Sequence, residues 1–159
     1  YLVCLSDVAL PDNHYDAPLY GFLMKSLDLI EEKIDMVVVT FIFELQVMSR
    51  FGAQLDFGQC VFCHRKDLPM DFSYKFNGCL CRNHFDEDMK RSHVDPNVIF
   101  LCQSFMAMDL EKLPSINLSD DLKKKIRVFI DALYDHYIGV QIKAKKFIDG
   151  LDGWADIMK

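Results

Sequence analysis

Residues 60–84 read CVFCHRKDLPMDFSYKFNGCLCRNH and interrupt a chain whose remaining pattern is mostly helical. Cys60 and Cys63 are separated by two residues, and Cys81 and His84 repeat that spacing after seventeen intervening residues. Each short knuckle turns the backbone so that both of its side chains face one ion, and zinc prefers thiolate and imidazole ligands in a tetrahedral arrangement. The sequence therefore predicts one structural Zn²⁺ held by Cys60, Cys63, Cys81 and His84.

Two neighbouring residues are alternatives for this ligand set. Cys79 can replace Cys81, although four residues would then separate it from His84. His64 directly follows Cys63 and would have to fold back sharply to bind, so we expect it on the surface. The remaining histidines, which we expect to be structural or solvent-facing, are His14, His93 and His136.

The distribution of the six cysteines favours a metal site over disulfides. Four of them crowd into residues 60–81 with histidines nearby, which is typical of metal ligands in a reducing compartment. Cys4 and Cys102 stand alone, and we expect both to be small buried hydrophobic residues.

The stretch between the knuckles has the pattern of a β-hairpin. Residues 72–76 alternate apolar and polar side chains, and Asn77-Gly78 is a turn signal. We therefore expect a small inserted ββ element.

Helical patterns flank this element on both sides. Asp16 and Asp95, each followed closely by proline, and Ser119 are expected N-caps. Residues 37–51 are apolar on most sides and end at Gly52; their β-branched start would allow a strand, but their length favours a buried helix. Gly139 is expected to kink the last amphipathic helix.

The predicted fold class is therefore mainly α, a helical bundle with an inserted small ββ zinc-finger element. The predicted organisation is residues 1–56 as the first part of the helical domain, 57–90 as the zinc-binding insert and 91–159 as the second part.

Composition limits the function classes. The chain has 159 residues, of which 51% are hydrophobic, and a net charge of −6. Residues 1–56 carry nine acidic and three basic groups, which argues against one large basic face for duplex DNA but allows a local basic patch. The longest uncharged stretch, residues 96–108, is thirteen residues long and too short for a membrane span. The chain opens on an apolar run without an initiator Met, so we interpret it as a fragment of a longer protein.

Two basic clusters are candidate binding surfaces. Residues 123, 124 and 127 are expected to share one helix face, opposite Ile126 and Phe129. This face can be simply solvated, or it can contact phosphates or an acidic peptide. The candidates are Lys123, Lys124, Lys125, Arg127, Lys143, Lys145 and Lys146.

The sequence has no catalytic constellation. It contains neither a glycine-rich phosphate loop nor a His-Glu-x-x-His motif. Asp86, Glu87 and Asp88 follow His84 and are expected in the first turns of a helix, where acidic residues are common without catalysis. We therefore expect that the protein is not an enzyme.

Several motifs together resemble the RecO family of bacterial DNA-repair proteins. Phe43-Glu44-Leu45-Gln46-Val47-Met48, then Gly52 and the first knuckle, are similar to the family signature, and Gly78–His84 is similar to its second knuckle. Residues 92–96 and 142–148 look like those of streptococcal members, and the resemblance extends from residue 1 to about residue 151.

This resemblance implies a recombination mediator in the bacterial cytoplasm, associated with the nucleoid. RecO proteins work with RecR to load RecA onto single-stranded DNA coated by SSB, and they anneal complementary strands. The implied partners are single- and double-stranded DNA, RecR and the acidic C-terminal tail of SSB, which the helical domain of the family receives. The family also has an N-terminal OB-fold, and nothing in this sequence has that pattern.

Two other functions fit the zinc spacing. The first is a zinc-scaffolded protein-interaction module without a nucleic-acid role, which the acidic balance favours. The second is a GTPase activator of the Arf-GAP type, which needs an arginine just after the second knuckle, whereas the next basic residues are Lys90 and Arg91. GATA-type and LIM-type modules use similar spacings.

Overall fold

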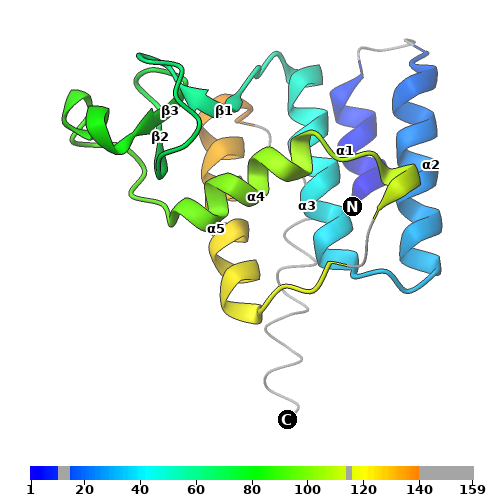
Figure 1. Ribbon diagram of the computed structural model, residues 1–159. Helices are drawn as coiled ribbons and strands as arrows, with labels where there is room; N and C mark the ends of the chain where they lie inside the picture. The colour runs from blue at the N-terminus through cyan, green and yellow to red at the C-terminus, as the bar shows by residue number, and fades with distance from the viewer. Residues whose placement is uncertain (11–14, 114–115, 140–159) are drawn as a thin grey trace, which may run out of the picture.

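The computed structural model describes residues 1–10, 15–113 and 116–139. Its α-helices are α1 (Leu2–Ala9), α2 (Ala17–Glu31), α3 (Met36–Val47), α4 (Pro96–Met106) and α5 (Asp120–Tyr137). Its strands are β1 (Asp56–Cys60), β2 (Met70–Ser73) and β3 (Gly78–Cys81), and its short 3₁₀ helices are η1 (Met48–Phe51), η2 (Arg82–Glu87) and η3 (Leu110–Lys112). The helices form a bundle, and the sheet lies at the side of α4 and α5 (Figure 1).

The predicted N-caps are confirmed. The side chains of Asp16 and Asp95 accept hydrogen bonds from the backbone N–H groups of Leu19 and Asn97, both at 2.9 Å. The Ser119 hydroxyl accepts from Leu122 at 3.3 Å. These side chains satisfy N–H groups that have no partner within their helices, so the sequence determines where α2, α4 and α5 begin.

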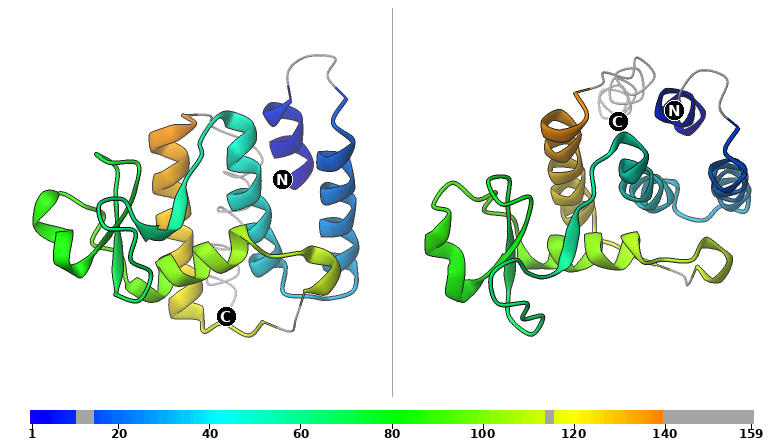
Figure 2. Two further views of the ribbon diagram at one scale, coloured as in Figure 1. Left: turned by 45° about the horizontal axis from the view of Figure 1, so that its top comes forward. Right: turned by 90° about the horizontal axis from the view of Figure 1, so that it is seen from above.

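The predicted buried helix is also confirmed, and the strand alternative is wrong. The α-helical part ends at Val47, η1 continues the chain, and Gly52 closes it with a φ of +83°. Helix α3 is the centre of the bundle: it contacts α1, α2, α4 and α5, and Figure 2 shows α5 on the opposite side of it from α1 and α2.

The described part of the last helix stops just before Gly139, where a kink was expected. Helix α5 ends at Tyr137, and Gly139 follows with a φ of +66°. Its N–H donates to the carbonyl of Tyr134 at 2.9 Å, so it terminates the helix as a left-handed C-terminal glycine. The residues after Gly139, where a kinked helix would continue, lie outside the described residues.

The insert contains three strands where a two-stranded hairpin was predicted. Strand β3 lies between β1, which is parallel to it, and β2, which is antiparallel. The hairpin itself is shifted: β2 ends at Ser73, residues 74–77 form the turn, and Gly78 already belongs to β3. A Cβ atom at Gly78 would lie 2.6 Å from Cγ1 of Val61, so close packing on the first knuckle requires glycine here.

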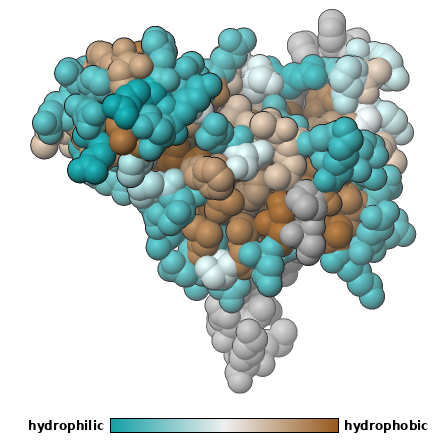
Figure 3. Space-filling model, in the orientation of Figure 1, coloured by the Kyte–Doolittle hydropathy of each residue, from teal (hydrophilic) through white to brown (hydrophobic). Residues whose placement is uncertain are grey.

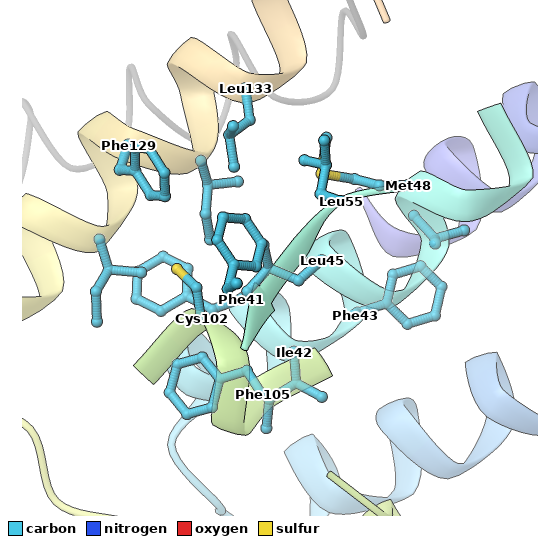
Figure 4. Packing of buried hydrophobic residues seen from close by; sticks show 14 of the residues in the cluster. Phe41, Ile42, Phe43, Leu45, Met48, Leu55, Cys102, Phe105, Phe129 and Leu133 are labelled. Atoms are coloured by element: carbon cyan, nitrogen blue, oxygen red, sulfur yellow. The ribbon is translucent and has the colours of Figure 1, made fainter. Parts of the chain in front are cut away.

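One hydrophobic core joins the helices and the sheet. Phe57 of β1 and Phe72 of β2 pack on Phe129 of α5, with ring centroids 6.0 and 5.8 Å away. Figure 4 shows Phe129 facing Phe41 and Cys102, which come from α3 and α4. The sheet therefore contributes to the same core as the bundle.

The two isolated cysteines differ. Cys102 is fully buried, as predicted, but the prediction for Cys4 is wrong because its side chain is exposed. Helix α1 turns Leu2, Leu5 and Ala9 inward, and this register leaves Cys4 on the outer face. Within the described residues, no helix is long and apolar enough to cross a membrane.

Candidate metal centre

The four predicted ligands lie together at one end of the sheet. Cys60 ends β1, Cys81 ends β3, Cys63 lies in the loop after β1 and His84 lies in η2. Their ligand atoms all lie within 4.8 Å of one another. The parallel pairing of β1 with β3 places the two knuckles side by side, so residues distant in sequence meet at one point.

Three of the six distances between these atoms match those around a tetrahedral zinc ion. Cys63 Sγ lies 3.7 Å from Cys81 Sγ, and His84 Nδ1 lies 3.5 Å from Cys60 Sγ and 3.4 Å from Cys81 Sγ. Zn–S bonds of about 2.3 Å and a Zn–N bond of about 2.0 Å, arranged tetrahedrally, place two sulfurs about 3.8 Å apart and a sulfur and a nitrogen about 3.5 Å apart. The cluster could therefore hold Zn²⁺, with His84 binding through Nδ1.

Backbone hydrogen bonds shape the first knuckle. The N–H of His64 donates to the carbonyl of Cys60 at 2.9 Å, and the N–H of Cys60 donates to the carbonyl of Arg65 at 3.0 Å. His64 takes a left-handed conformation with a φ of +57° to close this turn. Val61 is tied to β3 by its N–H, which donates to the carbonyl of Cys79 at 2.9 Å.

The electrostatics of Cys60 suit a thiolate ligand. Burial opposes ionisation of this thiol, but backbone hydrogen bonds from Cys81, Cys63 and Phe62 outweigh burial and lower its pKa to about 6. A metal-bound cysteine must be deprotonated, so this environment favours the form that binds. Cys60 and Cys81 are buried, and Cys63 is exposed.

The neighbouring cysteine and histidines lie away from the cluster. Cys79 is buried in the hydrophobic core, where burial first and the charge of Asp56 second raise the pKa of its thiol. His64, His93 and His136 are exposed, as expected. His14 lies outside the described residues.

The acidic residues after His84 do not begin an α-helix, contrary to the prediction. Asp86 and Glu87 are exposed in the last turn of η2, and Asp88 lies just beyond it and is buried. The Ser73 hydroxyl donates to Asp88 Oδ2 at 2.5 Å and lowers the pKa of that carboxyl. This hydrogen bond therefore connects the residue that follows η2 to the last residue of β2.

A second buried carboxylate, which the sequence analysis missed, anchors the segment that leads to α4. Asp71 accepts hydrogen bonds from the N–H groups of His93 and Val94 and from the Ser92 hydroxyl, at 2.8–3.0 Å. Arg91 Nε lies 2.9 Å from the same carboxylate. An aspartate within an apolar strand pattern is the one sequence signal that could have indicated this role.

The predicted basic face on α5 is only partly open to solvent. Lys123 pairs with Asp35 at 2.5 Å, and Lys125 lies 2.9 Å from Asp121 and 3.4 Å from Asp95. Lys124 is exposed. The second predicted cluster, Lys143, Lys145 and Lys146, lies outside the described residues.

Arg127 does not share the solvated face, which corrects the prediction. Its Nη1 donates to Glu44 Oε2 at 2.6 Å and its Nη2 donates to Glu44 Oε1 at 3.1 Å. Glu44 is fully buried in α3 and also accepts a 2.5 Å hydrogen bond from the Tyr1 hydroxyl. Arg127 therefore balances a buried negative charge between α3 and α5.

Comparison with known proteins indicates one family. The family model described as "Recombination protein O C terminal" matches residues 1–146. The chain is 57% identical over 159 residues to the DNA repair protein RecO of Lactococcus lactis subsp. lactis, covering 100% of this chain and 63% of that protein. It is 53% identical over 158 residues to the DNA repair protein RecO of Streptococcus thermophilus, covering 99% of this chain and 62% of the relative. The chain thus spans less than two thirds of these relatives, and no solved structure matches it.

Proposed function

Because this chain belongs to the RecO family, we propose that it acts in bacterial DNA repair and recombination as a mediator that is not an enzyme. In this proposal it helps RecR to load RecA onto single-stranded DNA coated by SSB, and it promotes annealing of complementary strands. The observation that carries the proposal is the match over residues 1–146, together with 57% identity to a protein named DNA repair protein RecO.

We propose a structural role for the metal. Three thiolates and one imidazole fill a tetrahedral coordination shell and leave no position for a reacting water or substrate. The distances of 3.4–3.7 Å between ligand atoms support this geometry. When bound, zinc would fix the ends of β1 and β3 and η2 relative to one another.

The proposed DNA and SSB-tail contacts use basic residues that remain accessible. Lys124 is exposed on α5, whereas Lys123 and Lys125 already have acidic partners. Lys143, Lys145 and Lys146 complete the set from the sequence alone. Phosphates or the acidic SSB tail would compete with the aspartates for the paired lysines.

Zinc analysis of the purified chain tests the metal site. We expect one zinc per chain, a lower zinc content in His84→Ala and an unchanged content in Cys79→Ser, because Cys79 is buried in the hydrophobic core. Zinc that is absent, or that depends on Cys79, would contradict the ligand assignment.

The salt dependence of DNA binding distinguishes the mediator from a zinc-scaffolded module that binds only proteins, which the net charge of −6 favours. A chain that contacts phosphates should bind a single-stranded oligonucleotide with a log–log salt slope of about −0.7 per phosphate contact. A chain that shows no binding at low salt would favour the protein-interaction module.

A further inference from the structure

An aromatic ring is exposed on the first knuckle, between two of the candidate ligands. The side chain of Phe62 is 44% exposed. The backbone on either side of it is fixed, because the N–H groups of Val61 and His64 both donate hydrogen bonds. A residue that merely covered the metal would be expected to lie buried against it. The ring of Phe100 is even more exposed, at 64%, so the groups around Phe62, rather than its exposure alone, distinguish it.

Phe62 is held by other aromatic groups. Its ring stacks on the His84 ring, with centroids 5.4 Å apart and an angle of 27° between the planes. The Phe76 ring meets it nearly perpendicularly at 5.0 Å, and Lys75 Nζ lies 4.6 Å from the centre of the Phe76 ring. These contacts fix the orientation of Phe62, so a ligand that stacks on it would lose little additional side-chain entropy.

The surroundings of Phe62 differ in charge from the N-terminal helices. Residues 61–90 include five exposed basic and three exposed acidic side chains, because Asp71 and Asp88 are buried. One of the acidic residues, Asp67, is paired with Arg65 at 2.6 Å. The exposed basic residues are Arg65, Lys66, Lys75, Arg82 and Lys90. The described part of residues 1–56, in contrast, has five exposed acidic and two exposed basic side chains.

Aromatic rings flanked by basic side chains bind single-stranded nucleic acid in a characteristic way. Each base presents a π-face that can stack on an aromatic ring, and the cations follow the phosphates. In a duplex the faces of the bases are already stacked on one another. The combination of a fixed, exposed ring and an excess of exposed cations therefore fits unpaired DNA better than duplex DNA.

We propose that Phe62 is a stacking platform for an unpaired base of single-stranded DNA, with Lys75, which lies over the neighbouring Phe76 ring, contacting an adjacent phosphate. This inference rests on the proposed function, because it assigns the DNA contact of that function to a specific surface. It gives the zinc element a direct role in binding, in addition to its role in the fold.

Fluorescence anisotropy with two oligonucleotides of equal length, one oligo(dT) and one abasic, tests the platform. We expect Phe62→Ala to weaken binding of oligo(dT) by about 5- to 150-fold and to leave binding of the abasic strand unchanged, because only the stacked base is lost. Phe62→Tyr should bind like the wild type. The matched control is Phe100→Ala, which removes a ring that is 64% exposed on α4 and should have no effect.

A spectroscopic measurement distinguishes stacking from a loss of structure. Trp154 is the only tryptophan of the chain, so Phe62→Trp combined with Trp154→Phe places a single fluorophore at the platform. Oligo(dT) should quench its emission, and the abasic strand should not. The zinc content of each variant is measured first, and if Phe62→Ala loses zinc, the quenching experiment decides.

The outcomes separate the platform from the proposed function. If the wild type binds oligo(dT), Phe62→Ala binds equally well and the tryptophan is not quenched, the platform is wrong and the proposed function stands. If the wild type binds neither strand, the platform and the DNA contact of the proposed function are both wrong. If Phe62→Ala instead impairs binding of a protein partner while oligo(dT) binding is unchanged, the ring is a protein contact and the platform is wrong.

Discussion

At the scale of single residues, the knuckle stores a small amount of strain at His64. Its φ of +57° lies in the left-handed region, which glycine adopts freely and other residues adopt at a cost. We expect His64→Gly to raise the free energy of unfolding of the zinc-loaded chain by up to about 1 kcal/mol, because the left-handed conformation costs roughly that amount. Chemical denaturation at fixed free zinc measures the change.

A β-branched residue provides the opposite test at the same position. His64→Val should destabilise the chain and weaken zinc binding, since branched side chains fit the left-handed region worst. Because His64 is exposed, neither substitution removes a buried contact. Equal stabilities of the glycine, valine and wild-type chains would show that the turn relaxes without cost.

The convergence of the four candidate ligands could be predicted from their spacing, but their surroundings could not. The repeated two-residue gap indicates which side chains converge, because a knuckle is a local structure. The position of His84 Nδ1 beside the cysteine sulfurs and the burial of Cys79 depend on how β1 and β3 pair, and that pairing joins segments about twenty residues apart. The same reason explains why Phe62 was not recognised as an exposed ring.

At the scale of helices, α3 and α5 are joined by a buried ion pair. Glu44 is fully buried, and removing one partner of such a pair leaves an unbalanced charge that costs about 3–5 kcal/mol. We therefore expect Arg127→Met to lower the free energy of unfolding by roughly that amount. Adding Glu44→Gln should recover most of the loss, because it removes the charge and keeps an acceptor for the Tyr1 hydroxyl.

Lys124→Met is the matched control on the same helix. This exposed lysine should change the free energy of unfolding by less than about 0.5 kcal/mol. If Arg127→Met were as stable as Lys124→Met, the ion pair would not contribute to the stability of the fold. Arg127 would then again be a candidate for contacting DNA. Charge runs in a sequence cannot make this distinction, because the partner of Arg127 lies 83 residues away.

The helices were more predictable than the strands for a physical reason. Asp16, Asp95 and Ser119 cap their helices through hydrogen bonds to residues two or three positions ahead, so the signal is local. Strand β1 contains Gly58 and has no alternating pattern, and it is ordered by its pairing with β3 and its packing on α4. A two-stranded element was therefore predicted where the chain forms three strands.

At the scale of the whole molecule, the shared core would couple binding of a metal by the candidate site to the stability of the helices. An insert that folded by itself, as the predicted boundary at residues 57–90 implies, would unfold alone when zinc is removed. Phe57 and Phe72 instead pack on Phe129, in the same hydrophobic cluster as the centre of α3. Loss of the metal should therefore expose one side of α5 and weaken the entire bundle.

We expect the zinc-loaded chain to unfold in a single thermal transition. Circular dichroism reports on the helices and hydrogen exchange reports on β1 and β2, and both should give the same midpoint. Each tenfold increase in free zinc above its Kd should add about 1.4 kcal/mol to the free energy of unfolding, since zinc binds the folded state. Chelation should lower the midpoint for both probes together, and Cys81→Ser, which lacks one proposed ligand, should not respond to zinc. If chelation abolished protection in the strands while the helices kept the same midpoint, the insert would be an independent unit, and the aromatic contacts between Phe57, Phe72 and Phe129 would not couple it to the bundle.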